Sequence, residues 1–239
     1  MRAIVKISNY EQPSTSKVEV VSSMKYQGGT LKTVKHWSKS LNSNMQFVIY
    51  LPDESVKEQR CDAYPALYCL SGLSSTHENF PIKSHFGQYA QQHKIACIFP
   101  DTSPRDTGVE GVKDDWQFGE GAGFYVDATN PKYSKNFNMY TYINEELPEI
   151  VSAHFHVDNS RKSITGFSMG GMGALLSYLK NSGKFRSVSA FAPISHPTAC
   201  NWGKNAFEKF FGSVEAGAAF DPTHLVKNWH GPKTPILID

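Results

Sequence analysis

One stretch decides the fold: Ile164–Gly171, with the sequence Ile-Thr-Gly-Phe-Ser-Met-Gly-Gly. It places the pattern Gly-x-Ser-x-Gly between a short apolar run and a helical pattern. A turn from strand to helix that is this tight strains the central residue, and flanking glycines remove side chains that would clash. The spacing predicts that Ser168 stands above a strand end, at a helix N-terminus, as a nucleophile. The alternative is an ordinary glycine-rich turn at the start of a helix.

Short apolar runs lie on both sides of this stretch, and most are stopped by Pro, Gly or Ser. Unbroken apolar runs of about five residues are typical of strands buried on both faces of a sheet. Helical periodicity falls between the runs, over 141–155 and 172–179. The alternation predicts an α/β fold with a mainly parallel sheet flanked by helices. The expected strands are 46–51, 66–70, 95–99, 163–165, 187–191 and 235–238.

Two regions lack such patterns. Residues 102–138 are rich in Gly, Asp and aromatic side chains, and loops of this length are usually functional. Residues 1–23 are polar and unpatterned, so we expect a flexible N-terminal extension over 1–23 and a folded domain over 24–239.

Composition narrows the function. The 239 residues include 40% hydrophobic residues, which argues against a disordered chain. Lys and Arg number 24 against 22 Asp and Glu, so the charge does not favour a nucleic-acid partner. No apolar stretch reaches the roughly 18 residues of a membrane span. The four cysteines, Cys61, Cys69, Cys97 and Cys200, form no Cys-x-x-Cys pair, and no histidines have zinc-finger spacing. We therefore expect a cytoplasmic protein without a metal, with buried reduced thiols at Cys69 and Cys97.

A serine nucleophile needs other groups. A base, normally histidine, must accept its proton, and two N–H donors must stabilise the oxyanion. One donor would be the backbone N–H of Met169, which directly follows the serine. The second should come from a loop after an earlier strand, and Leu73 in Ser71-Gly72-Leu73 is the candidate. The alternative for Leu73 is an ordinary glycine-containing turn.

Beyond these motifs, residues 28–239 resemble the S-formylglutathione hydrolase family, also called esterase D. The matching segments are 65–68, 70–73, 100–105, 121–129, 145–148, 166–171, 187–194 and 223–226. The resemblance implies an α/β-hydrolase fold and a homodimer. It also implies a serine thioesterase that hydrolyses S-formylglutathione to glutathione and formate without metal or cofactor, in the removal of formaldehyde.

Site roles follow from the same resemblance. Ser168 matches the nucleophile, and Leu73 and Met169 match the oxyanion donors. Trp202 matches a loop near the acyl pocket, although a structural aromatic is an equal alternative. The segment 121–129 would form a wall of the site, with Asp127 structural. His196 stands where relatives commonly have Asn or a small residue, and we interpret it as a surface histidine, with a position facing the site as the alternative. Asp106 stands where relatives tend to have Gly.

The end of the chain departs from the family. In this fold the triad order is Ser, Asp, His, and the family acid and base follow the strand 235–238. Neither position is present, so we expect an incomplete α/β-hydrolase domain over 24–239, lacking its last strand and helix. An apolar edge strand would be left exposed. Two alternatives stay open: a catalytically dead truncated remnant or splice form that acts only by binding, and a general carboxylesterase or acyltransferase.

Overall fold

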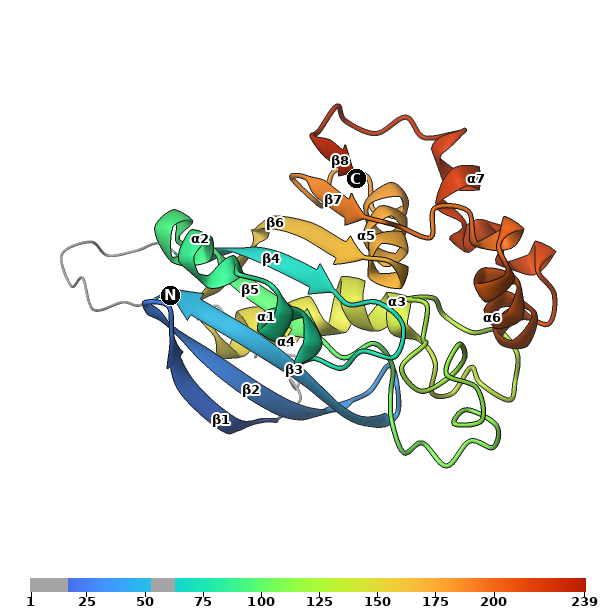
Figure 1. Cartoon of the computed structure of the whole chain (residues 1–239), viewed down its shortest axis with the longest axis horizontal. Coiled ribbons are helices and arrows are strands. Elements are labelled where there is room, and N and C mark those ends of the chain that lie inside the picture. The colour runs from blue at the N-terminus through green and yellow to red at the C-terminus, as the bar shows by residue number, and fades with distance from the viewer. Residues whose placement is uncertain (1–16, 53–62) are drawn as a thin grey trace, which may run out of the picture.

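Eight strands form a single mixed sheet in the computed structural model, which describes residues 17–52 and 63–239. Their order across the sheet is β1-β2-β3-β5-β4-β6-β7-β8 (Figure 1). The strands are β1 (Val18–Tyr26), β2 (Gly29–Ser38), β3 (Ser43–Pro52), β4 (Tyr64–Leu70), β5 (Ala96–Pro100), β6 (Val157–Phe167), β7 (Val188–Phe191) and β8 (Ile236–Ile238).

The sheet has an antiparallel half and a parallel half. Strands β1, β2, β3 and β5 pair antiparallel in that order. From β5 through β4, β6 and β7 to β8 every neighbouring pair is parallel. All six expected strands are present, and the predicted α/β fold is confirmed. The centre of the parallel half was predictable because β4 and β5 are largely buried on both faces and therefore read as continuous apolar runs.

The hairpin of β1 and β2 was not predicted. Strand β1 is exposed along most of its length, so its sequence lacks the apolar pattern of a buried strand. Its turn is set by Gln27 and Gly28, whose φ angles of 43° and 83° fit the mirror-image turn that matches strand twist.

The predicted extension needs correction at its inner end. Residues 18–23 belong to β1 and pair with β2, with Val18 opposite His36 and Met24 opposite Leu31. The boundary between 23 and 24 therefore falls inside a strand. Residues 1–16, and Cys61, lie outside the described residues.

Helices cover both faces of the sheet. They are α1 (Asn79–Lys83), α2 (Phe86–His93), α3 (Met139–Thr141), the π-helix η1 (Tyr142–Glu146), α4 (Leu147–His154), α5 (Met169–Lys180), the 3₁₀-helices η2 (Pro197–Ala199) and η3 (Glu215–Phe220), α6 (Asn201–Phe211) and α7 (Pro222–Val226). The two expected helices are confirmed, the first as the continuous segment from α3 through η1 to α4.

The two faces have separate cores. Alternate residues of β3 point to opposite sides, with Phe47 and Ile49 in the larger core and Val48 and Tyr50 in the smaller. The larger core includes buried residues of α4 and α5, whereas the smaller lies beneath α1 and α2, which Figure 1 shows in front of the sheet. Cys69 and Cys97 are buried free thiols in the smaller core, as predicted.

The segment between β5 and α3 contains no helix or strand longer than an isolated bridge, as its sequence predicts. It is nevertheless well packed, because Phe118 and Phe137 stack around Phe210 of α6 at ring distances of 4.7 and 5.5 Å. Backbone bonds from Thr129 and Asn130 to the Phe210 carbonyl fix the same contact. The segment between β5 and α3 therefore connects α6 to the sheet through these contacts.

At the other edge, β8 pairs with β7, and its apolar side chains Ile236, Leu237 and Ile238 are each at least 46% exposed. The expected exposed apolar edge is confirmed. Among residues 17–52 and 63–239, no helix is both long and apolar enough to cross a membrane.

Candidate active site

Ser168 occupies the turn between β6 and α5. Its φ and ψ of 56° and −118° lie in a region that non-glycine residues rarely adopt. Three backbone hydrogen bonds hold it there: its N–H donates to the Phe191 carbonyl at 2.9 Å, and its carbonyl accepts from Met172 at 3.1 Å and Ile194 at 3.3 Å. The strained turn predicted from Gly-x-Ser-x-Gly is therefore present.

Two glycines make this turn possible. A Cβ on Gly170 would lie 2.0 Å from the Leu70 carbonyl oxygen, and one on Gly166 would lie 2.1 Å from the Gly170 carbonyl oxygen. Contacts this short with backbone cannot be relieved by moving a side chain. The N-terminus of α5 thus lies directly against the ends of β4 and β6, which lifts Ser168 to the carboxyl edge of the parallel strands.

The loop after β4 lies beside the serine. A Cβ on Gly72 would sit 3.3 Å from the Ser168 Cβ, so the backbone of 71–73 is in contact with the turn. Within residues 17–52 and 63–239, neither the N–H of Leu73 nor that of Met169 donates a hydrogen bond. Met169 is the first residue of α5, where the helix leaves N–H groups without partners. Neither amide is therefore committed to another group of the described residues.

The long loop fixes the conformation of residues 71–75. Tyr125 donates its hydroxyl to the Ser71 carbonyl at 2.9 Å, and Ser74 donates its N–H to the Gly121 carbonyl at 2.8 Å. The Ser75 carbonyl accepts from Thr102 at 2.6 Å. Residues 121–125 thus border this loop, which supports their expected position as a wall.

An ion pair anchors the same region from β5. Arg105 donates to both carboxylate oxygens of Asp101, at 2.9 and 3.0 Å, and also to the Ser75 carbonyl at 3.0 Å. His77 Nδ1 lies 3.6 Å from the Asp101 carboxylate. Burial raises the pKa of Asp101, but the neighbouring His77 and Arg105 outweigh that effect and hold the pKa below its ordinary value. The Asp101–Arg105 ion pair therefore holds the loop that carries Leu73 in place through the Ser75 carbonyl.

A cavity of about 200 Å³ opens beside this loop. It lies between the loop, α1 and the end of β6, and among the described residues the one charged side chain in its lining is Lys83, at the end of α1. The cavity is lined by Ser71, Gly72, Ser75, Asn79, Phe80, Lys83, Ser84 and Phe167. Gly72 and Phe167 flank Ser168, so the cavity adjoins the serine.

The remaining candidates lie in different settings. Asp127 accepts hydrogen bonds from the N–H and hydroxyl of Thr141 at 2.9 and 2.6 Å, which confirms a structural role. Trp202 lies in the first turn of α6 and is 45% exposed, which is unlike a core aromatic. Asp106 has a φ of 53°, a left-handed conformation that glycine adopts most readily.

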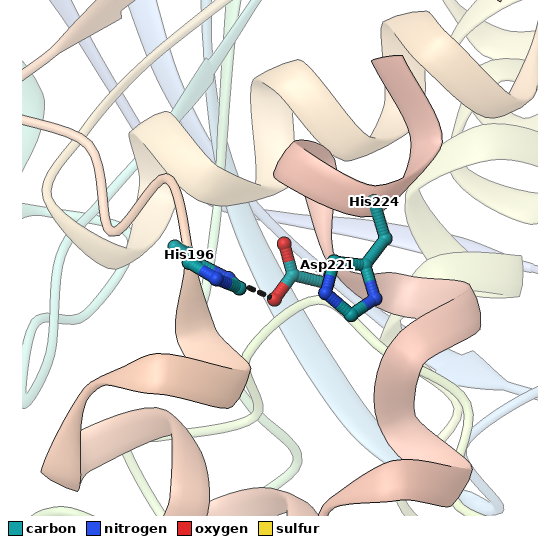
Figure 2. Close-up of side chains that lie close together, drawn as sticks. All are labelled: His196, Asp221 and His224. Carbon is teal, nitrogen blue, oxygen red and sulfur yellow. Dashed lines mark hydrogen bonds and ion pairs between the residues drawn. The ribbon is translucent and has the colours of Figure 1, made fainter. Parts of the chain in front are cut away.

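One constellation was missed from the sequence. His196, Asp221 and His224 converge on the loop after β7 and the start of α7 (Figure 2). The sequence signal is weak because His196 is distant from the other two, which themselves show only a spacing of one helical turn. The side chain of His196 is 42% exposed, in agreement with a surface histidine, but it is paired with Asp221 at 2.8 Å.

The sheet topology together with a strained serine at a strand-to-helix turn defines the class of α/β-hydrolase-fold esterases. Residues 38–236 match the family described as "Putative esterase". The chain is 48% identical over 224 residues to S-formylglutathione hydrolase of Rattus norvegicus, covering 93% of this chain and 78% of the relative. It is 44% identical to the Arabidopsis thaliana enzyme of that name, covering 94% and 78%. Its structure superposes on an S-formylglutathione hydrolase from Agrobacterium tumefaciens with a TM-score of 0.86 and 39% identity, covering 92% and 78%. The chain belongs to the S-formylglutathione hydrolase family.

The Asp101–Arg105 ion pair generates a prediction on stability. Asp101→Asn should lower the free energy of unfolding at pH 7 by about 2–4 kcal/mol, because Arg105 keeps its charge and loses its partner. The lowered pKa means that the Asp101 carboxylate stabilises the fold above its unfolded pKa of about 3.9 and that this stabilisation is lost as the pH falls through its folded pKa. The difference in the free energy of unfolding between wild type and Asp101→Asn should therefore become smaller below about pH 4.

Urea unfolding at several pH values measures this gap. Asp106→Asn is the matched control, since Asp106 pairs with Lys113 on the exposed surface of the same loop and its loss should change stability little. A gap that stays constant from pH 7 to pH 3 would contradict the assigned ion pair.

Proposed function

We propose that this chain is a serine thioesterase that hydrolyses S-formylglutathione to glutathione and formate, with Ser168 as the nucleophile. The observation that carries the proposal is a strained serine next to two backbone N–H groups that donate no hydrogen bond among the described residues. Ser168 stands at the N-terminus of α5, and the loop holding Leu73 lies against it. The relatives named above, which carry S-formylglutathione hydrolase as their name, support the choice of substrate.

The proposed reaction is acyl transfer to serine followed by hydrolysis. Ser168 Oγ attacks the formyl carbon, and the N–H groups of Leu73 and Met169 donate to the resulting oxyanion. One such donor contributes about 10²- to 10³-fold to the rate. The C–S bond then breaks, the glutathione sulfur leaves with the electron pair, and a proton restores the thiol. Water hydrolyses the formyl-serine ester, which releases formate and regenerates the hydroxyl.

A base must accept the serine proton in the first step. Among residues 17–52 and 63–239 no side chain hydrogen-bonds Ser168 Oγ, so we assign only the nucleophile and the oxyanion donors.

The two sides of the serine suit the two parts of the substrate. The cavity with Lys83 lies on the side of Gly72 and Phe167, and we place the glutathione carboxylates there because Lys83 is its charged lining residue. Ile194 donates its N–H to the Ser168 carbonyl, and from there the chain continues through η2 to Trp202. We therefore place Trp202 beside the acyl group.

We further propose a cytoplasmic location and a homodimer. Buried free thiols at Cys69 and Cys97 suit a reducing compartment. The homodimer rests on the family resemblance, and light scattering of the purified chain measures it directly.

Removal of the nucleophile tests the proposal first. Ser168→Ala should lower the turnover of S-formylglutathione by about 10³-fold or more, because no other hydroxyl can form the acyl intermediate. Ser182→Ala, an exposed serine just beyond the far end of α5, should leave turnover unchanged. Equal rates in wild type and Ser168→Ala would rule out Ser168 as the nucleophile. Mass spectrometry after rapid quenching should find the formyl group on the peptide that contains Ser168.

The acyl preference separates this activity from that of a general carboxylesterase. Glutathione thioesters with formyl, acetyl and butyryl groups should be hydrolysed with falling kcat/KM, because each added methylene must fit beside Trp202, and one methylene that does not fit costs about tenfold or more. Equal or rising kcat/KM along the series would instead favour the carboxylesterase interpretation.

The role of Lys83 generates a third test. Lys83→Ala should raise KM for S-formylglutathione about two- to fivefold at low ionic strength with little change in kcat, since an exposed charge pair of this kind contributes weakly to binding. The effect should shrink in about 1 M salt. Lys227→Ala, at the exposed end of α7, is the matched control. An unchanged KM in Lys83→Ala would contradict the proposal that the glutathione leaving group binds in this cavity.

A further inference from the structure

Three potential metal-ligating side chains converge at the junction of the β7 loop and α7. His196 lies in the loop after β7, Asp221 is the N-cap of α7, and His224 lies within that helix. One ligand atom from each can be chosen so that all three lie within 4.8 Å of one another. Figure 2 shows the Asp221 carboxylate between the two imidazole rings, whose centroids are 5.3 Å apart.

The carboxylate is already oriented by its surroundings. Asp221 is fully buried, and its Oδ2 atom accepts from His196 Nδ1 at 2.8 Å and from the Thr198 N–H and hydroxyl at 3.0 and 2.6 Å. Oδ1 accepts from the Thr223 N–H at 2.8 Å. The carboxylate is thus held beside two imidazoles, with further donors fixing its direction, as around protein metal ligands.

We propose that His196, Asp221 and His224 form a binding site for one divalent transition-metal ion of the zinc type. Two imidazole nitrogens and a carboxylate oxygen are a common ligand set for such ions, which leaves a fourth position for water or another ligand. The ion takes the place of the hydrogen bond between His196 Nδ1 and Asp221 Oδ2, and the neutral imidazole then carries its N–H on Nε2.

The geometry needs only a small adjustment. Zinc bonds of about 2.0–2.2 Å in a tetrahedral arrangement put ligand atoms about 3.3 Å apart. His196 Nδ1 and Asp221 Oδ2, now 2.8 Å apart, must therefore move slightly apart. The ligand atoms that are farthest from each other, which are at most 4.8 Å apart, must move closer. Rotation of the two side chains is sufficient, because His196 is 42% exposed and His224 is only partly buried. The Thr198 and Thr223 bonds to Asp221 need not break.

The loop that carries His196 contacts the candidate nucleophile in space. Ile194, two residues before His196, donates its N–H to the Ser168 carbonyl at 3.3 Å. After His196 the chain runs through η2 into α6 and Trp202. A bound ion therefore fixes this loop to α7, and metal binding should raise the thermal midpoint of the folded chain.

Titration of the purified chain with Zn²⁺ against a competing chromophoric chelator tests the site. We expect one ion per chain, with a Kd raised at least tenfold by His196→Asn and by His224→Gln. His230→Gln, which changes an exposed histidine further along the same segment, should leave Kd unchanged. The Zn²⁺-dependent rise in thermal midpoint should disappear in the same two variants only.

Substitution with Co²⁺ identifies the ligands. Visible bands of a tetrahedral ion without a near-ultraviolet thiolate band are expected, because the ligand set contains no cysteine. His196→Asn decides the outcome, since this exposed side chain can be replaced without opening the core, and circular dichroism confirms its fold. Absence of stoichiometric binding, an unchanged Kd in His196→Asn, or a thiolate band would each overturn the proposal and leave Asp221 as a helix cap paired with a histidine.

Discussion

The close approach of the α5 N-terminus to the ends of β4 and β6 is the constraint on which the rest depends. Gly170 lies so near the Leu70 carbonyl that even a methyl group would overlap it. This contact forces Ser168 into its strained conformation and leaves the Met169 amide pointing away from any partner among the described residues. Strain of this kind costs about 1–3 kcal/mol, and it persists only where surrounding structure fixes it. Here three backbone hydrogen bonds to Ser168, from both β7 and α5, supply that fixation.

The loop that carries Leu73 has a different kind of support. It contains no regular structure, so its carbonyl groups need partners from elsewhere, and the segment 102–138 supplies them through Thr102, Arg105 and Tyr125. The charged Asp101–Arg105 pair lies at the centre of this support. Such pairs contribute modestly to net stability, but they favour one conformation because a misplaced partner leaves a buried charge unpaired. The arrangement fits a loop whose amide must point at a single position.

The candidate functional residues lie at the edge of the sheet where the parallel strands end. Ser168 follows β6, Leu73 follows β4, and His196 follows β7, so three neighbouring strands deliver their loops to one place. This is the general rule for ligand sites in open α/β sheets. The histidine and aspartate cluster belongs to the same edge, and α7 brings its second half there.

The sequence by itself determined the parallel strands, the two long helical segments and the serine turn. Each depends on neighbouring residues: continuous apolar runs mark buried strands, and Gly-x-Ser-x-Gly encodes its own steric requirement. The hairpin of β1 and β2 escaped prediction because an exposed edge strand places no apolar pattern on its residues. Only the tertiary structure decided which amides lack a hydrogen-bond partner among the described residues, that Arg105 supports the Leu73 loop, and that His196 meets Asp221 and His224. Those relations join residues far apart in the chain, and their distances are set by how strands and helices pack, which no local pattern records.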